Sequence, residues 1–234
     1  MNRLLFLSCE HASRAIPRNL SFYFQNPEAQ RLLPTHRGYD IGAAEVFRRL
    51  AQILQPTYAT EGSYSRLAID LNRNSNKNHR YSAFTSSISP EAKNFLENYF
   101  DNYRNAFWEA ASRELQKQND TQILHLSIHS FTPVLNGVER NADFGLLYDP
   151  SRKTESAFAA SMKNHLRENR AEWRIRFNYP YLGKTDGHTT ALRKCLPPEK
   201  YIGIELEMNQ ALFQRFDSRE IAVFLAAAIQ KSYF

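Results

Sequence analysis

The stretch LLFLSCEHAS, residues 4–13, places a short apolar run directly before Cys9, Glu10 and His11. A secretory signal would need an apolar core of roughly 7–15 residues, and the continuous run LLFL is much shorter than that. A short apolar run that stops at polar residues is typical of a buried strand in a parallel sheet. We therefore predict a first strand that delivers Glu10 and His11 to a site at its carboxyl end.

The rest of the chain alternates strand patterns with helical patterns. Residues 40–54 repeat apolar side chains at helical spacing. The triplet Ser89-Pro90-Glu91 combines a capping residue, a proline at the first turn and an early acid, which is typical of a helix start. This alternation predicts one α/β domain over residues 1–234, built around a mostly parallel sheet. The predicted strands are 4–8, 57–60, 123–128, 144–148, 175–177 and 201–205; the predicted helices are 40–54, 89–116, 154–167 and 217–230, the last capped by Asp217.

The composition limits the possible classes of function. The 234 residues carry a net charge of +6, but the basic residues are scattered and form no nucleic-acid-binding motif, so we expect no nucleic-acid partner. No segment approaches the roughly 18 apolar residues of a membrane span. Two cysteines, Cys9 and Cys195, give no disulfide framework, so we expect a cytoplasmic protein. The sequence does not indicate an oligomeric state.

Polar side chains that carry chemistry follow three of the predicted strands. Glu10 and His11 end the first, His129 ends ILHLSI, and Glu205 and Glu207 lie at the far end of YIGIELE. Ligands of open α/β sheets gather at the carboxyl ends of strands. Two histidines and a carboxylate are a zinc ligand set with an open position, and a further carboxylate can act as general base. The alternative is that these histidines are only hydrogen-bonded, and the residues alone leave both interpretations open.

A second group of polar residues lies in SRLAIDLNR, residues 65–73. Arg66, Asn72 and Arg73 could bind a carboxylate, because a guanidinium offers a planar pair of donors and an amide adds another. Asp70 could orient either arginine. The alternative is a surface turn with solvated charges.

Several motifs in order carry a resemblance to a known family. They are SCEHAS-x-x-IP, HRGYDIGA, SRLAIDLNR, LSIHS and IGIELEMNQ, with ERNADFGLLYD and NYPYLGKTDG between them. The sequence resembles the N-formylglutamate amidohydrolase family from Cys9 to about Gln210. That family is similar in fold to the zinc carboxypeptidases and aspartoacylase. The resemblance therefore implies a mixed, mostly parallel central sheet flanked by helices.

The resemblance also implies one zinc ion. His11 and His129 match metal-binding histidines of the family. The carboxypeptidase pattern HxxE is broken here by Arg14, so the third ligand is either Asp40 or the alternative Glu10, and we prefer Asp40. Asp40 could instead cap the helix that follows it, since aspartate is a favoured cap.

Further roles follow from the same resemblance. Glu205 matches the general base. Glu207, on the same strand face by the two-residue period, is expected to support the site from behind or to lie at its rim. Arg66, Asn72 and Arg73 match a substrate clamp, with Arg66 also counted as catalytic. Additional substrate-binding residues are predicted at Arg140 and Tyr181, and residues 181–188 are expected to form a loop over the site.

The predicted function is zinc-dependent hydrolysis of an N-acyl amino acid, with N-formyl-L-glutamate or a similar acidic compound as the small-molecule substrate. One alternative is a related metallo-amidase or carboxypeptidase that acts on another N-acyl amino acid or a cell-wall peptide. A second is a non-catalytic anion- or nucleic-acid-binding module on the same fold.

Overall fold

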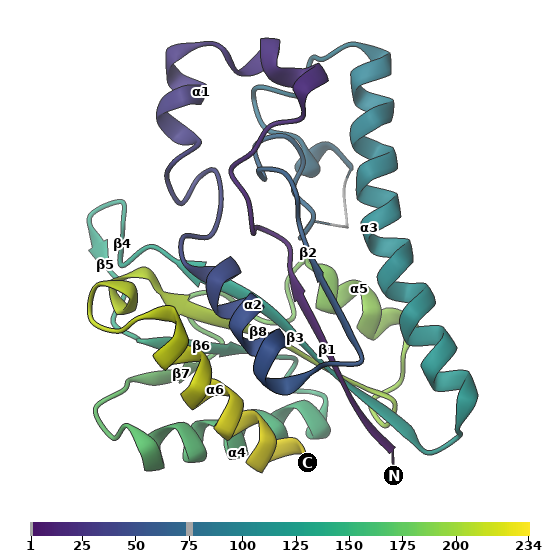
Figure 1. Cartoon of the computed structure of the whole chain (residues 1–234), viewed down its shortest axis with the longest axis vertical. Helices are drawn as coiled ribbons and strands as arrows, with labels where there is room; N and C mark the ends of the chain where they lie inside the picture. Colours follow the sequence, from purple (N-terminus) through teal and green to yellow (C-terminus); the bar gives the residue numbers. More distant parts are fainter. Residues whose placement is uncertain (1, 74–76) are drawn as a thin grey trace.

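A six-stranded sheet with the order β2-β1-β3-β8-β6-β7 forms the centre of the computed structural model, which describes residues 2–73 and 77–234 (Figure 1). Strands β2, β1, β3 and β8 are parallel, β6 is antiparallel to β8, and β7 is parallel to β6. The predicted α/β fold with a mixed, mostly parallel sheet is thus confirmed. The strands are β1 (Asn2–Cys9), β2 (Tyr58–Glu61), β3 (Thr121–Phe131), β6 (Phe144–Leu147), β7 (Ile175–Phe177) and β8 (Tyr201–Asn209), and a separate hairpin pairs β4 (Val134–Leu135) with β5 (Val138–Glu139).

Helices cover both faces of the sheet (Figure 1). Helices α2, α4 and α6 pack on one face, and α3 and α5 pack on the other. No helix in the described part of the chain is long and apolar enough to cross a lipid bilayer. The helices are α1 (Pro27–Leu32), α2 (Ala43–Leu54), α3 (Pro90–Lys117), α4 (Lys153–Asn169), α5 (His188–Cys195) and α6 (Ser218–Tyr233), with 3-10 turns η1 (Arg18–Phe24), η2 (Lys77–Arg80) and η3 (Gln210–Gln214).

Strand β3 decides which face of the sheet carries polar residues. All of its residues are buried, and Leu124, Leu126 and Ile128 join the apolar cluster under α2, α4 and α6. The two-residue period then turns His125, Ser127 and His129 toward the α3 and α5 face. The neighbouring strands follow the same alternation in register, so polar side chains of three strands share that face.

A second apolar cluster lies beyond the sheet. It joins η1, α1, the segment 67–71 and the N-terminal half of α3, including Leu96 and Phe100. In Figure 1, α1 and this half of α3 stand above the sheet edge. The cluster buries Leu67, Ile69 and Leu71, so the polar residues between and after them are fixed above the strand ends.

The start of α2 differs from the sequence-based prediction. The helix begins at Ala43, and its N-cap is Gly42 with φ 81°. A side chain at position 42 would also collide with the Phe213 ring, since a Cβ there would lie 2.4 Å from it. Asp40 therefore does not cap the helix, and its carboxylate is available to the site.

The predicted cap of the last helix is confirmed. The Asp217 carboxylate accepts a hydrogen bond from the Glu220 backbone N–H at 2.7 Å. We expect Asp217→Ala to lower the free energy of unfolding by about 1 kcal/mol, because that N–H loses its partner. Asp217→Asn, whose side-chain oxygen can still accept the hydrogen bond, should lower the free energy of unfolding much less. Urea unfolding of the two variants checks this, and equal losses would contradict a capping role.

Candidate functional site

A cavity of about 190 Å³ opens at the carboxyl ends of β1, β3 and β8. Almost every side chain that the sequence singled out lines it. These residues are His11, Asp40, Arg66, Asn72, Arg73, His129, Arg140, Tyr181 and Glu205. The structure thus brings together nine predicted residues from distant parts of the chain, while the tenth, Glu10, lies behind the cavity wall.

His11 follows the end of β1 and is buried. Its Nε2 lies 2.6 Å from Oδ1 of Asp70, which holds the ring from one side. Its Nδ1 lies 3.5 Å from Oδ2 of Asp40 and has no hydrogen-bond partner among the described residues. A buried nitrogen without a partner is costly unless a ligand completes it.

His129 presents the same arrangement from β3. Its Nδ1 lies 2.9 Å from Oδ2 of Asp40. Its Nε2 lies 2.8 Å from Oγ of Ser127 and 3.2 Å from Oε2 of Glu10. Both histidines therefore turn Nδ1 toward the Asp40 carboxylate and have a carboxylate behind Nε2.

Asp40 is held from several directions. Its backbone N–H donates to the His11 carbonyl at 2.9 Å, the Ser130 N–H donates to Oδ2 at 3.2 Å, and Arg66 pairs with Oδ1. Burial by itself would raise the pKa of this carboxyl, but Arg66 and the two histidines hold the pKa well below its usual range. Asp40 is thus an ionised carboxylate that lies between two imidazoles.

These donors fit a zinc ion. Ligand atoms in a tetrahedral zinc site with bonds of about 2.0–2.2 Å lie roughly 3.3 Å apart. The two Nδ1–Oδ2 separations are 2.9 and 3.5 Å. His11, Asp40 and His129 also form a buried cluster whose ligand atoms all lie within 4.8 Å of one another. Together with the unpartnered Nδ1 of His11, this geometry supports the prediction of a metal site with Asp40 rather than Glu10 as its carboxylate.

Two further carboxylates of β8 reach the cavity. Glu205 pairs in register with Ser127, and its Oε1 accepts a hydrogen bond from Thr189 at 2.9 Å. Glu207 pairs in register with His129, is buried, and its Oε2 has no hydrogen-bond partner in the described structure. Burial raises the pKa of Glu207 to about 8, with the charges of Asp40 and Glu205 acting in the same direction. Glu207, which we expected behind the site or at its rim, is therefore the more closely enclosed of the two.

The predicted carboxylate-binding residues surround the same cavity. Asn72 is fixed by the His188 backbone N–H, which donates to its Oδ1 at 2.7 Å, and Arg73 is half exposed beside it. Arg140 lies with its guanidinium 5.1 Å from the centroid of the Tyr181 ring, within range of a cation–π contact. Arg66 is partly engaged by Asp40. The positive side chains thus lie on the cavity wall, but their roles stay predictions.

The structure assigns two residues a place that the sequence did not. Asp70, expected to orient an arginine, binds Nε2 of His11 at 2.6 Å and lies 3.7 Å from Arg73. His188, expected in a loop, begins α5 and is buried against Glu10. The alternating pattern of β1 and β3 could have placed Glu10 and Ser127 on the His129 face, but nothing local in the sequence pairs position 11 with 70 or 10 with 188.

Comparisons with known proteins identify related folds and a family. The chain is similar to a gene product of known crystal structure from Agrobacterium tumefaciens, at 24% identity and a TM-score of 0.79, over 97% of this chain and 89% of that one. It is also similar to N-formylglutamate amidohydrolase from Ralstonia eutropha JMP134, at 16% identity and a TM-score of 0.67, over 98% and 93% of the two chains. At these identities the likeness shows a shared fold. No curated protein matches the sequence significantly. Residues 4–214 match the family described as N-formylglutamate amidohydrolase, and the chain belongs to that family.

Proposed function

We propose that this amidohydrolase cleaves the amide bond of an N-acyl amino acid, most simply N-formyl-L-glutamate or a similar acidic compound, with one zinc ion. The observation that carries the proposal is the meeting of His11, Asp40 and His129 in one cavity with Arg66, Arg73 and Arg140. The cavity volume of about 190 Å³ lies below the roughly 300–1,000 Å³ of sites for drug-sized ligands. This size favours an N-acyl amino acid over a cell-wall peptide.

A zinc ion held by His11, Asp40 and His129 would polarise the acyl carbonyl and make water a better nucleophile at neutral pH. The chain itself must then supply a base that takes a proton from the attacking water and passes it to the departing amine. The sequence-based prediction gives this role to Glu205. The geometry favours Glu207, because it lies beside His129 in register and keeps an unpartnered oxygen, while Thr189 engages Glu205. A zinc ion held by the neighbouring donors would lower the raised pKa of the Glu207 carboxyl, so that its ionised form could accept the proton. We therefore propose Glu207 as the base and keep Glu205 as the alternative.

The substrate carboxylate would bind at the positive side of the cavity. Asn72 and Arg73 offer an amide and a guanidinium next to each other, and Arg140 lies on the same wall. Binding there would orient the amide toward the three zinc donors, and orientation of this kind lowers the barrier of the chemical step. The non-catalytic alternative explains the positive wall but not the three buried donors beside two further carboxylates. A cytoplasmic location remains a prediction.

A substrate comparison tests the proposal. With zinc added, N-formyl-L-glutamate should be hydrolysed, and its α-carboxamide analogue should show kcat/KM lower by about 10–100-fold, since the charged donors on the cavity wall lose their anionic partner. Arg73→Ala should raise KM for N-formyl-L-glutamate and reduce the ratio of the kcat/KM values of the two substrates. Arg176→Ala, a change outside the cavity, should have neither effect. Failure to hydrolyse any of a panel of N-acyl amino acids with zinc present would refute the proposal.

A further inference from the structure

A buried polar network lies behind His129, on the side away from the cavity. It is centred on Glu10, which is 1% exposed and does not line the cavity. His188, equally buried, contacts it from α5, and Tyr103 contacts it from α3. The roles proposed above for the cavity residues use none of these three side chains.

Both oxygens of Glu10 are occupied. Oε2 accepts a hydrogen bond from Ser127 Oγ at 2.6 Å and lies 3.2 Å from Nε2 of His129. Oε1 lies 2.9 Å from Nδ1 of His188 and accepts from the Tyr103 hydroxyl at 3.3 Å. A carboxylate with this many donors around it has one favoured orientation, since any rotation would leave buried polar groups unpaired.

The consequence for His129 is a defined tautomer. The Ser127 hydroxyl donates its hydrogen bond to Glu10, so its oxygen is free to accept one from Nε2 of His129, and Glu10 also faces the same Nε2. The Asn72 amide also lies near this Nε2, but at the longer distance of 3.4 Å. In the neutral, metal-binding ring we therefore place the hydrogen on Nε2, which leaves the lone pair of Nδ1 for a cation held between it and Asp40, whose Oδ2 is 2.9 Å away. A carboxylate behind a metal-binding histidine orients the ring and increases its basicity.

His188 links this network to the rest of the site. The backbone N–H of His188 donates to Asn72, and the next residue, Thr189, donates to Glu205. Gly187 allows this close approach, because a Cβ there would lie 2.7 Å from Glu205 Oε1. The segment 187–189 therefore contacts three parts of the site. It contacts Glu10 behind His129, Asn72 of the predicted substrate clamp, and Glu205 of the cavity.

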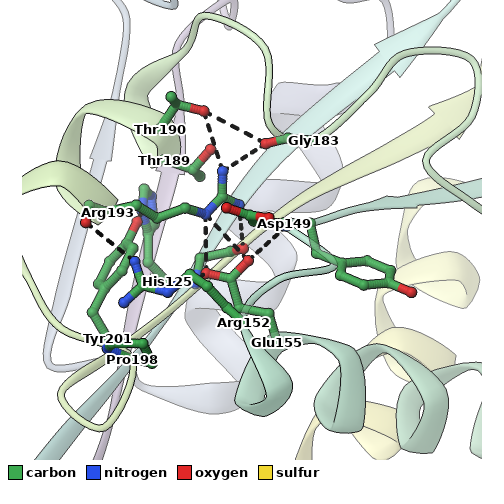
Figure 2. A network of polar contacts seen from close by, with 12 residues as sticks. His125, Asp149, Arg152, Glu155, Gly183, Thr189, Thr190, Arg193, Pro198 and Tyr201 are labelled. Atoms are coloured by element: carbon green, nitrogen blue, oxygen red, sulfur yellow. Dashed lines mark hydrogen bonds and ion pairs between the residues drawn. The ribbon is translucent and has the colours of Figure 1, made fainter.

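The opposite part of α5 is anchored to the sheet. Figure 2 shows the Arg193 guanidinium bound to Glu155, to the Gly183 carbonyl and to Thr190. The same group donates to the Gly203 carbonyl of β8 at 2.7 Å. Arg193 thus fixes α5 against the strand that carries the cavity carboxylates, and the first turn of α5 is held in place.

We propose that Glu10 and His188 are positioning residues that raise the zinc affinity of the site by fixing His129 with Nδ1 toward Asp40. The inference rests on the zinc site of the proposed function. Glu10, His125 and His188 also lie close enough together to hold a metal ion, but we assign no zinc to them. Both ring nitrogens of His125 are already bonded, to Ser8 Oγ and Tyr201 OH, each at 2.7 Å.

The test measures the zinc dissociation constant by competition with a chromophoric chelator, together with the melting temperature of the zinc-free protein. Glu10→Gln should weaken zinc binding by about 10–100-fold, the usual effect of losing such a partner. His188→Ala should weaken it by several-fold, and His188→Gln, whose amide can still donate to Glu10, should recover most of that loss. Tyr201→Phe is the matched control: it removes a bond of His125 in the same buried layer without touching Glu10, and should leave zinc affinity within about twofold.

Two results would overturn the inference. One is unchanged zinc affinity in both Glu10→Gln and His188→Ala, whatever happens to the melting temperature, which would make the network merely structural. The other is binding of two zinc ions by the unmodified chain with loss of one in His188→Ala, which would make His188 a ligand. If the unmodified chain bound no zinc, the proposed function would fail first, and that outcome is distinct from both.

Discussion

His129→Ala is expected to reduce the zinc content from about one equivalent to near zero, and to reduce turnover by about 10³-fold or more. The variant removes one of the three proposed zinc donors, and it also leaves the ionised Asp40 with one imidazole fewer beside it. Metal analysis after dialysis, combined with the hydrolysis assay, measures both effects. Circular dichroism should show the α/β fold retained, because the cavity side of β3 carries polar residues while its apolar residues pack on the other face.

A matched control sharpens this result. His36 lines the same cavity but does not belong to the three-donor cluster. His36→Ala should therefore keep its zinc while it changes the same wall of the cavity. Normal zinc content in His129→Ala, or equal loss in His36→Ala, would exclude His129 as a specific ligand.

Glu207→Gln is expected to keep zinc and lose about 10²–10⁴-fold in kcat, the usual contribution of a general base. Glutamine has nearly the same shape but cannot take a proton. Glu205→Gln should lower kcat by a smaller factor, because the Thr189 hydroxyl can still donate to the amide oxygen and the cavity keeps its shape. Steady-state kinetics of both variants, each with measured zinc content, provide the comparison. The reverse order would restore the sequence-based assignment of the base to Glu205, and unimpaired turnover in both would reject a carboxylate base on β8.

The sheet and the clustering of the site were predictable because both follow from short-range rules. Apolar runs that stop at Glu10-His11 and at His129 define parallel strands, and adjacent parallel strands bring their carboxyl ends to one edge. The alternation in β3 then decides which side chains share the polar face. These arguments need only the pattern within each strand.

The parts that were missed depend on contacts between distant residues. Helix α5 begins HTT after a glycine, a weak helical sequence, and is held in place by Arg193 and by the burial of Leu192. Asp70 binds a histidine that lies 59 positions earlier, and His188 binds a carboxylate 178 positions earlier. No local spacing encodes such pairs, so the residues behind the two imidazoles emerged only with the fold.

Asp40 illustrates a prediction that needed the structure to distinguish two roles. Its place before a helical pattern made it a plausible cap, and the family resemblance made it a plausible ligand. The left-handed Gly42 starts the helix two residues later, so the carboxylate is left facing the two histidines.

The central claim is that His11, Asp40 and His129 hold one zinc ion, with Nδ1 of each histidine as the donor. The most direct test is a crystal structure of the zinc-loaded protein with anomalous data collected on both sides of the zinc absorption edge. We predict a single zinc peak about 2.0–2.2 Å from both Nδ1 atoms and from the Asp40 carboxylate. A peak bound instead among Glu10, His125 and His188, or coordination through Nε2 of His11 or His129, would contradict it.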